Sequence, residues 1–293
     1  TLMSFHEELA PSEIGDMIRE MDTMFISEGF ETVYEWASDK IKEYPNCNML
    51  IWQVAVMLDA RRLTDVTIDS EKYDEQINAW YELVLKDEDE KIKRHAADSL
   101  FGFYLRKREY VKAEEYLQYF SDNDPMKKIY QGRLYKEQGD KENAYKTFED
   151  IVLSAYHTLN FAFSLMTGLA LEEGDIQEAR YLAEKMGAIA GIFEMGKYHE
   201  CVSMLDVVCA EKNVEETYHI VEQLLTSVDS LCDFQKSRLF QHMNFSETGS
   251  LFAENLKEKL LEGFRDSEAF GHMRGAMAWE DLLQKNRRSG AYH

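Results

Sequence analysis

The sequence is poor in proline, glycine and cysteine. Only 3 Pro and 15 Gly occur in 293 residues, and no run of alternating β-branched residues is long enough for a sheet. With 45% hydrophobic residues, the chain has the composition of an all-α protein that can bury a large core. The length does not fix the number of domains, because helical repeat proteins grow around one continuous core.

Basic residues are also scarce. The chain has 33 Lys plus Arg against 55 Asp plus Glu, which gives a net charge of −22. A surface this acidic repels phosphate backbones and anionic lipid, so we expect no direct nucleic-acid contact by this chain. A well-solvated helical surface is the plain interpretation, and an acidic groove for a basic ligand is the alternative.

Long hydrophobic runs are absent. No stretch of 18 apolar residues occurs, and the first four residues lack a signal-peptide pattern, so we expect no membrane partner and a cytoplasmic location. The sequence begins with Thr1 rather than Met, and we expect it to be a fragment of a longer protein. Four irregularly spaced cysteines, without a C-x-x-C motif, predict reduced and mostly buried thiols; they are Cys47, Cys201, Cys209 and Cys232.

The clearest pattern is that of one helical hairpin. Its defining residues are Gly132, Tyr135, Gly139, Asp140, Ala144 and Phe148. The first two lie three apart on one helix face, and the small residue lets a partner helix approach closely. The glycine then ends that helix and the aspartate caps the next one. The last two, four residues apart, form the inward stripe of the second helix.

Weaker copies of this hairpin occur on both sides. At a spacing of 35 residues, Gly174-Asp175 ends the first helix of a following pair, with Thr167 at its contact position and Ala179 in its second helix. At an offset of 31 upstream, Tyr104 and Ala113 fit the pattern, although Arg108 replaces the glycine. Further second helices are predicted at Ile77 with Tyr81, Val33 with Ala37, and Thr217 with Val221 and Leu224.

The repeats predict the fold class. We count roughly six helix pairs, which predicts an all-α, right-handed superhelix of antiparallel pairs, a tetratricopeptide-like α-solenoid. A polar loop is expected at residues 63–70, and the small residues 187–191 permit close packing or a kink. The repeat spacing is lost at residues 232–248, before a different helical unit. We therefore predict a repeat array over residues 1–231 and a C-terminal helical capping segment, packed on the array, over residues 232–293.

Apparent catalytic and metal motifs are weak. Gly191 to Tyr198 matches G-x-x-x-x-G-K, but a tyrosine replaces the required Ser or Thr and a helix precedes the motif instead of a strand. Glu216 and His219 form a single E-x-x-H, whereas di-iron bundles need two copies. No G-x-S-x-G occurs. We predict that the chain is not an enzyme and has no catalytic, cofactor-binding or metal-binding residues.

The ligand groove is predicted from the resemblance of these hairpins to tetratricopeptide repeats. In that class, residues around the small contact position of each first helix line the concave surface. The positions selected in this way, or one turn earlier, are His95, Asp98, Ile129, Arg133, Lys136, Phe161 and Ser164. Arg133 and Lys136 share a face and would hold a carboxylate such as a peptide C-terminus; ion pairs with neighbouring Glu and Asp are the alternative.

Three segments in the first half and the end of the chain resemble a known family. The segments Ile41–Cys47, Tyr73–Leu85 and Arg108–Leu117, together with the closing stretch Leu251–Trp279, look like the C-terminal region of bacterial XRE-family (Cro/cI-type) helix-turn-helix transcriptional regulators. The resemblance implies a sensor and dimerisation region that follows a small N-terminal DNA-binding domain. No such domain is recognisable near Thr1, so DNA contact is expected only through a domain absent from this sequence.

Two functions follow from these patterns. The first is the regulatory ligand- or protein-binding and dimerisation region of a bacterial transcriptional regulator, with a peptide or protein in the concave groove. A homodimer is expected because operators read by such regulators are usually two-fold symmetric. The second is a free-standing adaptor that binds a partner protein or peptide in the same groove.

Overall fold

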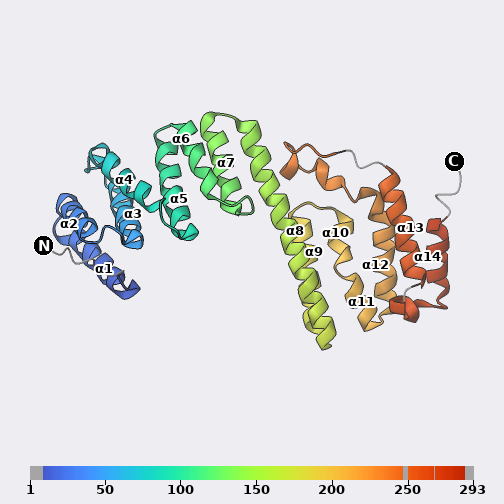
Figure 1. Cartoon of the computed structure of the whole chain (residues 1–293). Helices are drawn as coiled ribbons and strands as arrows, with labels where there is room; N and C mark the ends of the chain where they lie inside the picture. Colours follow the sequence, from blue (N-terminus) through green and yellow to red (C-terminus); the bar gives the residue numbers. More distant parts are fainter. Residues whose placement is uncertain (1–8, 247–249, 267, 288–293) are drawn as a thin grey trace. The chain divides into compact units, whose positions relative to one another are not determined.

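The protein is all-helical, as the composition predicts. The computed structural model describes residues 9–246, 250–266 and 268–287. Over these ranges it contains fourteen α-helices and six short 3-10 helices, and no β-strand (Figure 1). The chain divides into two compact units, Thr1–Ala144 (unit 1) and Tyr145–His293 (unit 2). The right-handed superhelix and the boundary between residues 231 and 232 stay predictions.

Unit 1 is a series of helices in which each helix packs against the next. The first, third and fifth helices also contact one another in that order, which is how the first helices of stacked pairs meet. The elements are α1 (Pro11–Ser27), α2 (Phe30–Glu43), α3 (Asn48–Thr64), η1 (Ser70–Tyr73), α4 (Asp74–Val84), α5 (Glu90–Arg106), α6 (Tyr110–Glu115), η2 (Tyr116–Tyr119) and α7 (Pro125–Gln138).

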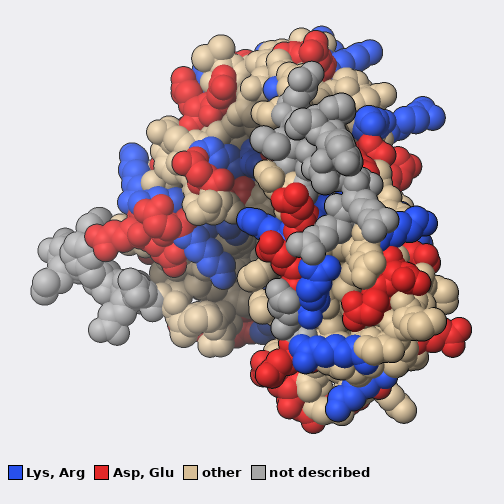
Figure 2. Space-filling model, turned by 90° about the vertical axis from the view of Figure 1, so that its right-hand side faces the viewer, with Lys and Arg blue, Asp and Glu red and all other residues tan. Residues whose placement is uncertain are grey.

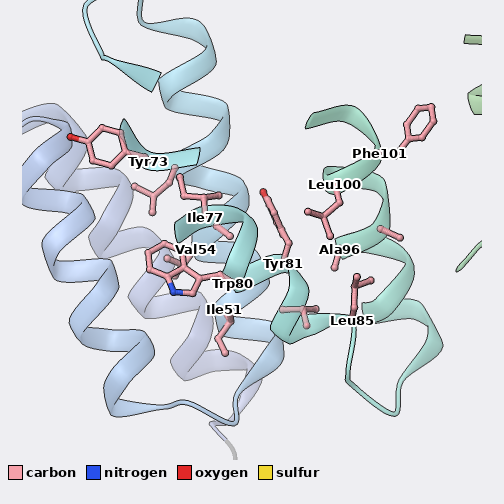
Figure 3. Packing of buried hydrophobic residues seen from close by; sticks show 14 of the residues in the cluster. Ile51, Val54, Tyr73, Ile77, Trp80, Tyr81, Leu85, Ala96, Leu100 and Phe101 are labelled. Carbon is pink, nitrogen blue, oxygen red and sulfur yellow. The ribbon is translucent and has the colours of Figure 1, made fainter. Parts of the chain in front are cut away.

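The core of unit 1 is one continuous cluster of buried side chains that runs from α1 to α7. Figure 3 shows its centre, where Tyr81 of α4 points toward Ala96 and Leu100 of α5. The predicted pair Ile77 and Tyr81 is 0% and 1% exposed, so the inward stripe expected for that helix is confirmed. The loop expected at residues 63–70 is shorter in the structure, where α3 extends to Thr64 and η1 begins at Ser70, so that residues 65–69 connect them.

The helix ends predicted by the repeat share one backbone motif. Their terminal residues adopt a left-handed conformation, with φ of 60° at Arg108, 84° at Gly139 and 78° at Gly174. In each case the backbone N–H of the following residue donates a hydrogen bond, 2.9 Å long, to the backbone carbonyl five residues earlier. The pairs are Glu109–Tyr104, Asp140–Tyr135 and Asp175–Ala170. This is the bond of a Schellman C-cap. The upstream register is therefore confirmed, because Arg108 adopts the conformation that the other two positions give to glycine.

Unit 2 begins within a long helix and ends in a group of shorter ones. The elements are α8 (Lys141–Glu173), α9 (Ile176–Ile192), α10 (Lys197–Val202), α11 (Leu205–Glu211), α12 (Val214–Ser227), η3 (Val228–Ser230), η4 (Asp233–Lys236), η5 (Arg238–Phe240), α13 (Ser250–Asp266), η6 (Glu268–Met273) and α14 (Met277–Arg287). Its described buried side chains form three clusters, and Phe163 packs against two of them. The loss of repeat spacing after residue 231 matches a stretch of isolated 3-10 turns, although residues 247–249 lie outside the described part.

One element departs from the repeat pattern. The spacing places the second helix of one pair and the first helix of the next between Asp140 and Gly174, whereas the structure has a single helix of 33 residues there. No proline lies within it, and no residue of it adopts the left-handed conformation that ends the other helices. Without a chain-breaking residue the two predicted helices continue as one.

The small-residue run at 187–191 lies at a close helix contact, as expected. A Cβ atom on Gly187 of α9 would lie 2.6 Å from the backbone oxygen of Glu200 in α10, so only glycine permits this approach. Within the described ranges, no helix combines the length and apolar character that crossing a lipid bilayer requires.

Candidate ligand-binding face

One side of α5 is left open by the packing of unit 1. His95, Asp98, Gly102 and Arg106 follow one another at spacings of three or four residues, so they share a face. The opposite side carries Ala96 and Leu100, which are both fully buried. We call this side of α5, together with Trp52 of α3 and with Tyr130 and Arg133 of α7, the open face.

His95 connects α5 to α3. Its ring stacks on the ring of Trp52 with a centroid separation of 4.4 Å and an interplanar angle of 17°. Burial lowers the pKa of His95, and the positive charges of Arg94 and Lys91 lower it further. These effects favour the neutral form of the imidazole.

Asp98 connects α5 to α7. The Tyr130 hydroxyl donates a hydrogen bond to the Asp98 carboxylate, and the Tyr130 ring stacks on Phe101 at a centroid distance of 4.6 Å. Burial, followed by the hydrogen bond to Asp98, raises the pKa of Tyr130. Phe101 and Tyr130 are packing residues, as the sequence predicts, and they also form an aromatic platform at the edge of the open face.

Arg133 lies on this platform. Its guanidinium carbon is 5.9 Å from the centroid of the Phe101 ring and 5.8 Å from that of Tyr130, which is within the range of a cation–π interaction. The side chain is exposed, and no described carboxylate forms an ion pair with it. Lys136, by contrast, has its ammonium 3.7 Å from Glu137. Lys136 therefore forms the kind of ion pair with a neighbouring acidic residue that the sequence offered as the alternative, and Arg133 does not.

The remaining predicted groove residues have different surroundings. Ile129 is half-buried and packs against the core of unit 1, so it contributes to packing beneath the open face. Phe161 and Ser164 are exposed residues of α8 and belong to unit 2. Their membership of a common groove with the five residues of unit 1 stays a prediction.

Sequence reasoning missed the contribution of α3. Trp52 carries a buried indole N–H without a hydrogen-bond partner, and Asn78 Oδ1 and the Tyr81 hydroxyl of α4 are buried and unpartnered as well. A buried polar atom of this kind costs free energy that an ordered water or a ligand would recover. The sequence gives no local sign of the role of Trp52, because its stack on His95 joins two different helices.

A shallow cleft lies beside the N-terminal turn of α5. It encloses about 570 Å³ and is lined by Glu90, Lys91, Arg94, Gln118, Tyr119, Phe120, Ser121 and Asp124. Its strongest charges are already paired, since Arg94 Nη1 lies 2.8 Å from Asp124 Oδ2. Lys91, which also lines the cleft, is exposed and has no ion pair among the described residues.

Two other arginine clusters are structural. Arg62 is 1% exposed and bridges Asp59 at 2.7 Å and Asp74 at 2.5 Å, and its Nη1 also donates 2.8 Å to the Ser70 carbonyl. It thereby fastens the connection between α3 and α4. In unit 2, Arg180 of α9 bridges Glu211 and Glu216 in the same way but is 29% exposed.

The surface carries charged side chains of both signs. On the face in Figure 2, lysine and arginine side chains lie among aspartate and glutamate side chains. Among the described residues, no group of His, Cys, Asp and Glu side chains is arranged to hold a metal ion. No family model, curated protein or solved structure matches the chain, so the argument for function depends on the geometry of the open face.

Proposed function

We propose that unit 1 binds a peptide or protein segment with a free carboxylate on its open face. Arg133 is the observation that carries this proposal. The chain has 55 acidic residues against 33 basic ones, so an exposed arginine has many carboxylates to pair with. Arg133 instead lies over two rings, which leaves its N–H groups available to a ligand.

The aromatic platform prepares Arg133 for this role. Contact with the rings of Phe101 and Tyr130 limits the rotamers of a side chain that would otherwise lose entropy on binding. A guanidinium presents its N–H groups in a fork that matches the two oxygens of a carboxylate. A C-terminal carboxylate, or an Asp or Glu side chain, fits this geometry.

The length of the open face agrees with a short peptide. From His95 to Arg106 the face follows α5 for roughly 16 Å, at 1.5 Å per residue. An extended peptide of about five residues covers that distance. The stacked Trp52 and His95 rings at one end offer an apolar contact. Near the other end the Arg106 guanidinium lies beside Gly102, where an added Cβ would be 3.4 Å from Arg106 Nη1.

The biological setting is part of the proposal. The resemblance to the C-terminal region of helix-turn-helix regulators supports a regulatory region in which ligand binding on the repeats acts on an attached DNA-binding domain. The net charge of −22 supports DNA contact through that other domain, because this chain repels phosphate. A homodimer fits the same setting.

The proposal is tested with a pool of random ten-residue peptides, prepared once with a free C-terminal carboxylate and once with a C-terminal amide. The full chain is incubated with each pool, separated by size exclusion, and the retained peptides are identified by mass spectrometry. We expect retention from the free-acid pool and little from the amide pool. Replacing Arg133 with Gln should weaken binding of the retained peptides about 10- to 100-fold, the range for a hydrogen bond to a charged group.

The matched control is Arg274→Gln, which removes the same charge from an exposed residue of unit 2. This variant should bind the free-acid peptides as tightly as the unmodified chain. Equal retention of both pools, or equal affinity of the Arg133→Gln and Arg274→Gln variants, would show that Arg133 does not anchor a carboxylate.

A further inference from the structure

The middle of α8 has a composition unlike the rest of the chain. From Ile151 to Leu171 no Asp, Glu, Lys or Arg occurs, whereas 30% of the whole chain is charged. A helix that is apolar on all sides is normally covered on all sides. This stretch belongs to the long helix in Figure 1.

Only one side of this stretch is covered. Tyr156, Thr167 and Ala170 are 1%, 7% and 4% exposed, and two of them pack in clusters with residues of α9. The other side carries large apolar side chains in the open. Their exposed fractions are 38% for Leu159, 68% for Phe161, 55% for Leu165, 48% for Met166 and 59% for Leu169. We call these five residues, together with Ala155 and Ala162 of the same helix, the α8 patch.

We propose that the α8 patch is the interface at which two copies of this chain associate. Two copies that each carry a net charge of −22 repel one another over most of their surface. The α8 patch contains no charged residue, so two copies meet there with the least repulsion. A two-fold interface also uses the same patch on both copies, and this patch is complementary to itself because it is uniformly apolar.

The helix dipole favours an antiparallel arrangement. Side-chain charges do not distinguish the two arrangements, because Glu149 and Asp150 precede the uncharged stretch and Glu172 and Glu173 follow it. In an antiparallel pair the partial positive end of each helix lies beside the partial negative end of the other. Ala155 and Ala162, both exposed, allow the two helices to approach closely.

The size of the patch is sufficient for a weak to moderate dimer. The five exposed side chains offer roughly 600 Å² on each copy, which compares with about 800 Å² per partner in a standard interface. Contacts beside the helix would add to this area. The proposal does not depend on the ligand at the open face of unit 1, since all the residues involved belong to unit 2.

The first test is sedimentation equilibrium of the full chain between 1 and 100 µM. We expect a mass that approaches twice 34.3 kDa as the concentration rises. Replacing Leu165 with Glu should weaken the dimer at least 10-fold, because each copy then buries a charge. The matched control is Ile192→Glu, an isolated exposed residue of α9 (74%), which should leave the dimer unchanged.

The second test fixes the arrangement by disulfide cross-linking in solution. A two-fold axis near the middle of the patch predicts that the Ala162→Cys chain links to a second copy of itself. Ala155 and Leu169 lie seven residues on either side of Ala162, so an antiparallel pair links Ala155→Cys to Leu169→Cys in a mixture of the two variants. A parallel pair would instead link each of these variants to itself.

Each outcome decides the proposal. A dimer that dissociates in the Leu165→Glu variant and gives the mixed cross-link supports it. A monomer at 100 µM, a dimer unaffected by Leu165→Glu, parallel cross-links, or open-ended polymers would overturn it. Circular dichroism of the Leu165→Glu variant must match that of the unmodified chain, and Leu165→Ser serves as a milder variant if it does not.

Discussion

The two units contain the same kind of secondary structure but organise their cores differently. The described residues of unit 1 form one hydrophobic cluster that extends from α1 to α7, whereas those of unit 2 form three smaller clusters. Helices of similar length that stack in pairs pass their contacts from one pair to the next. In unit 2 the 33-residue α8 stands beside short helices and 3-10 turns, so its neighbours cannot cover all of its apolar surface. Regular stacking leaves an open polar face, and irregular stacking leaves an open apolar one.

The largest expected difference between the units concerns their two bridging arginines. Replacing Arg62 with Met should lower the free energy of unfolding of unit 1 by about 3 kcal/mol, because Asp59 and Asp74 lose their buried partner. Asp59 keeps Arg106 at 3.8 Å and Asp74 keeps Lys107 at 2.9 Å. Replacing Arg180 with Met should lower that of unit 2 by about 1 kcal/mol, because the pair is partly exposed and screened by solvent. Urea unfolding followed by tryptophan fluorescence reports mainly on unit 1, which holds Trp36, Trp52 and Trp80, and circular dichroism reports on both.

Lys42→Met is the control for these variants, because Lys42 forms an exposed pair with Asp39 and should contribute little. Equal losses for Arg62→Met and Arg180→Met would show that burial does not separate the two clusters.

A smaller effect is expected from two helical glycines of unit 2. At Gly187 an added Cβ would lie 2.6 Å from the Glu200 backbone oxygen, so Gly187→Ala should push α9 and α10 apart and cost about 2 kcal/mol. At Gly168 nothing lies within 4 Å of an added Cβ, so Gly168→Ala should stabilise α8 by about 0.5–1 kcal/mol. Thermal unfolding by calorimetry should therefore give shifts of opposite sign; a stabilising Gly187→Ala would contradict the close approach.

The smallest effect is pH-dependent and compares one histidine in each unit. Burial lowers the pKa of His95 in unit 1 and of His199 in unit 2. Both therefore contribute stability above pH 6.5 that is lost as the pH falls through the lowered pKa of the folded state, because the unfolded chain takes up a proton first. We expect His95→Gln and His199→Gln each to reduce this acid loss.

The measurement is the urea midpoint at pH 7.5 and pH 5 for each variant. The effect of His199 should be the larger one, since its ring is enclosed by Tyr156 and Phe234, whereas His95 has one aromatic face covered by Trp52. If the urea midpoint decreases by the same amount between pH 7.5 and pH 5 in the variants and in the unmodified chain, groups other than these histidines cause the loss of stability in acid.

The sequence predicts the parts of the fold that depend on local chemistry. Gly139-Asp140 and Gly174-Asp175 mark helix ends because a left-handed residue followed by a capping aspartate is readable from residue type. The continuous α8 was not predicted. The repeat spacing implies a turn between two helices in this region, but the sequence has no helix-breaking residue there to form one. The left-handed conformations of Glu194 and Lys212 were also missed, since neither residue type signals them.

The candidate site was predicted in part for a similar reason. The resemblance to tetratricopeptide hairpins selected Asp98 of α5 and Arg133 of α7, and in the structure both contact Tyr130. The stacking of His95 on Trp52 depends on how α3 packs against α5, which is a tertiary contact between residues far apart in the sequence. No local pattern carries that information.

The central claim is that Arg133 on the open face of unit 1 holds a carboxylate. The most direct measurement is nuclear magnetic resonance of the arginine side-chain Nε–H groups in the full chain, titrated with a peptide retained from the free-acid pool. The account predicts that the Arg133 resonance shifts with the peptide concentration while those of Arg62 and Arg180 do not move. A titration that shifts other arginines and leaves the Arg133 resonance in place would contradict it.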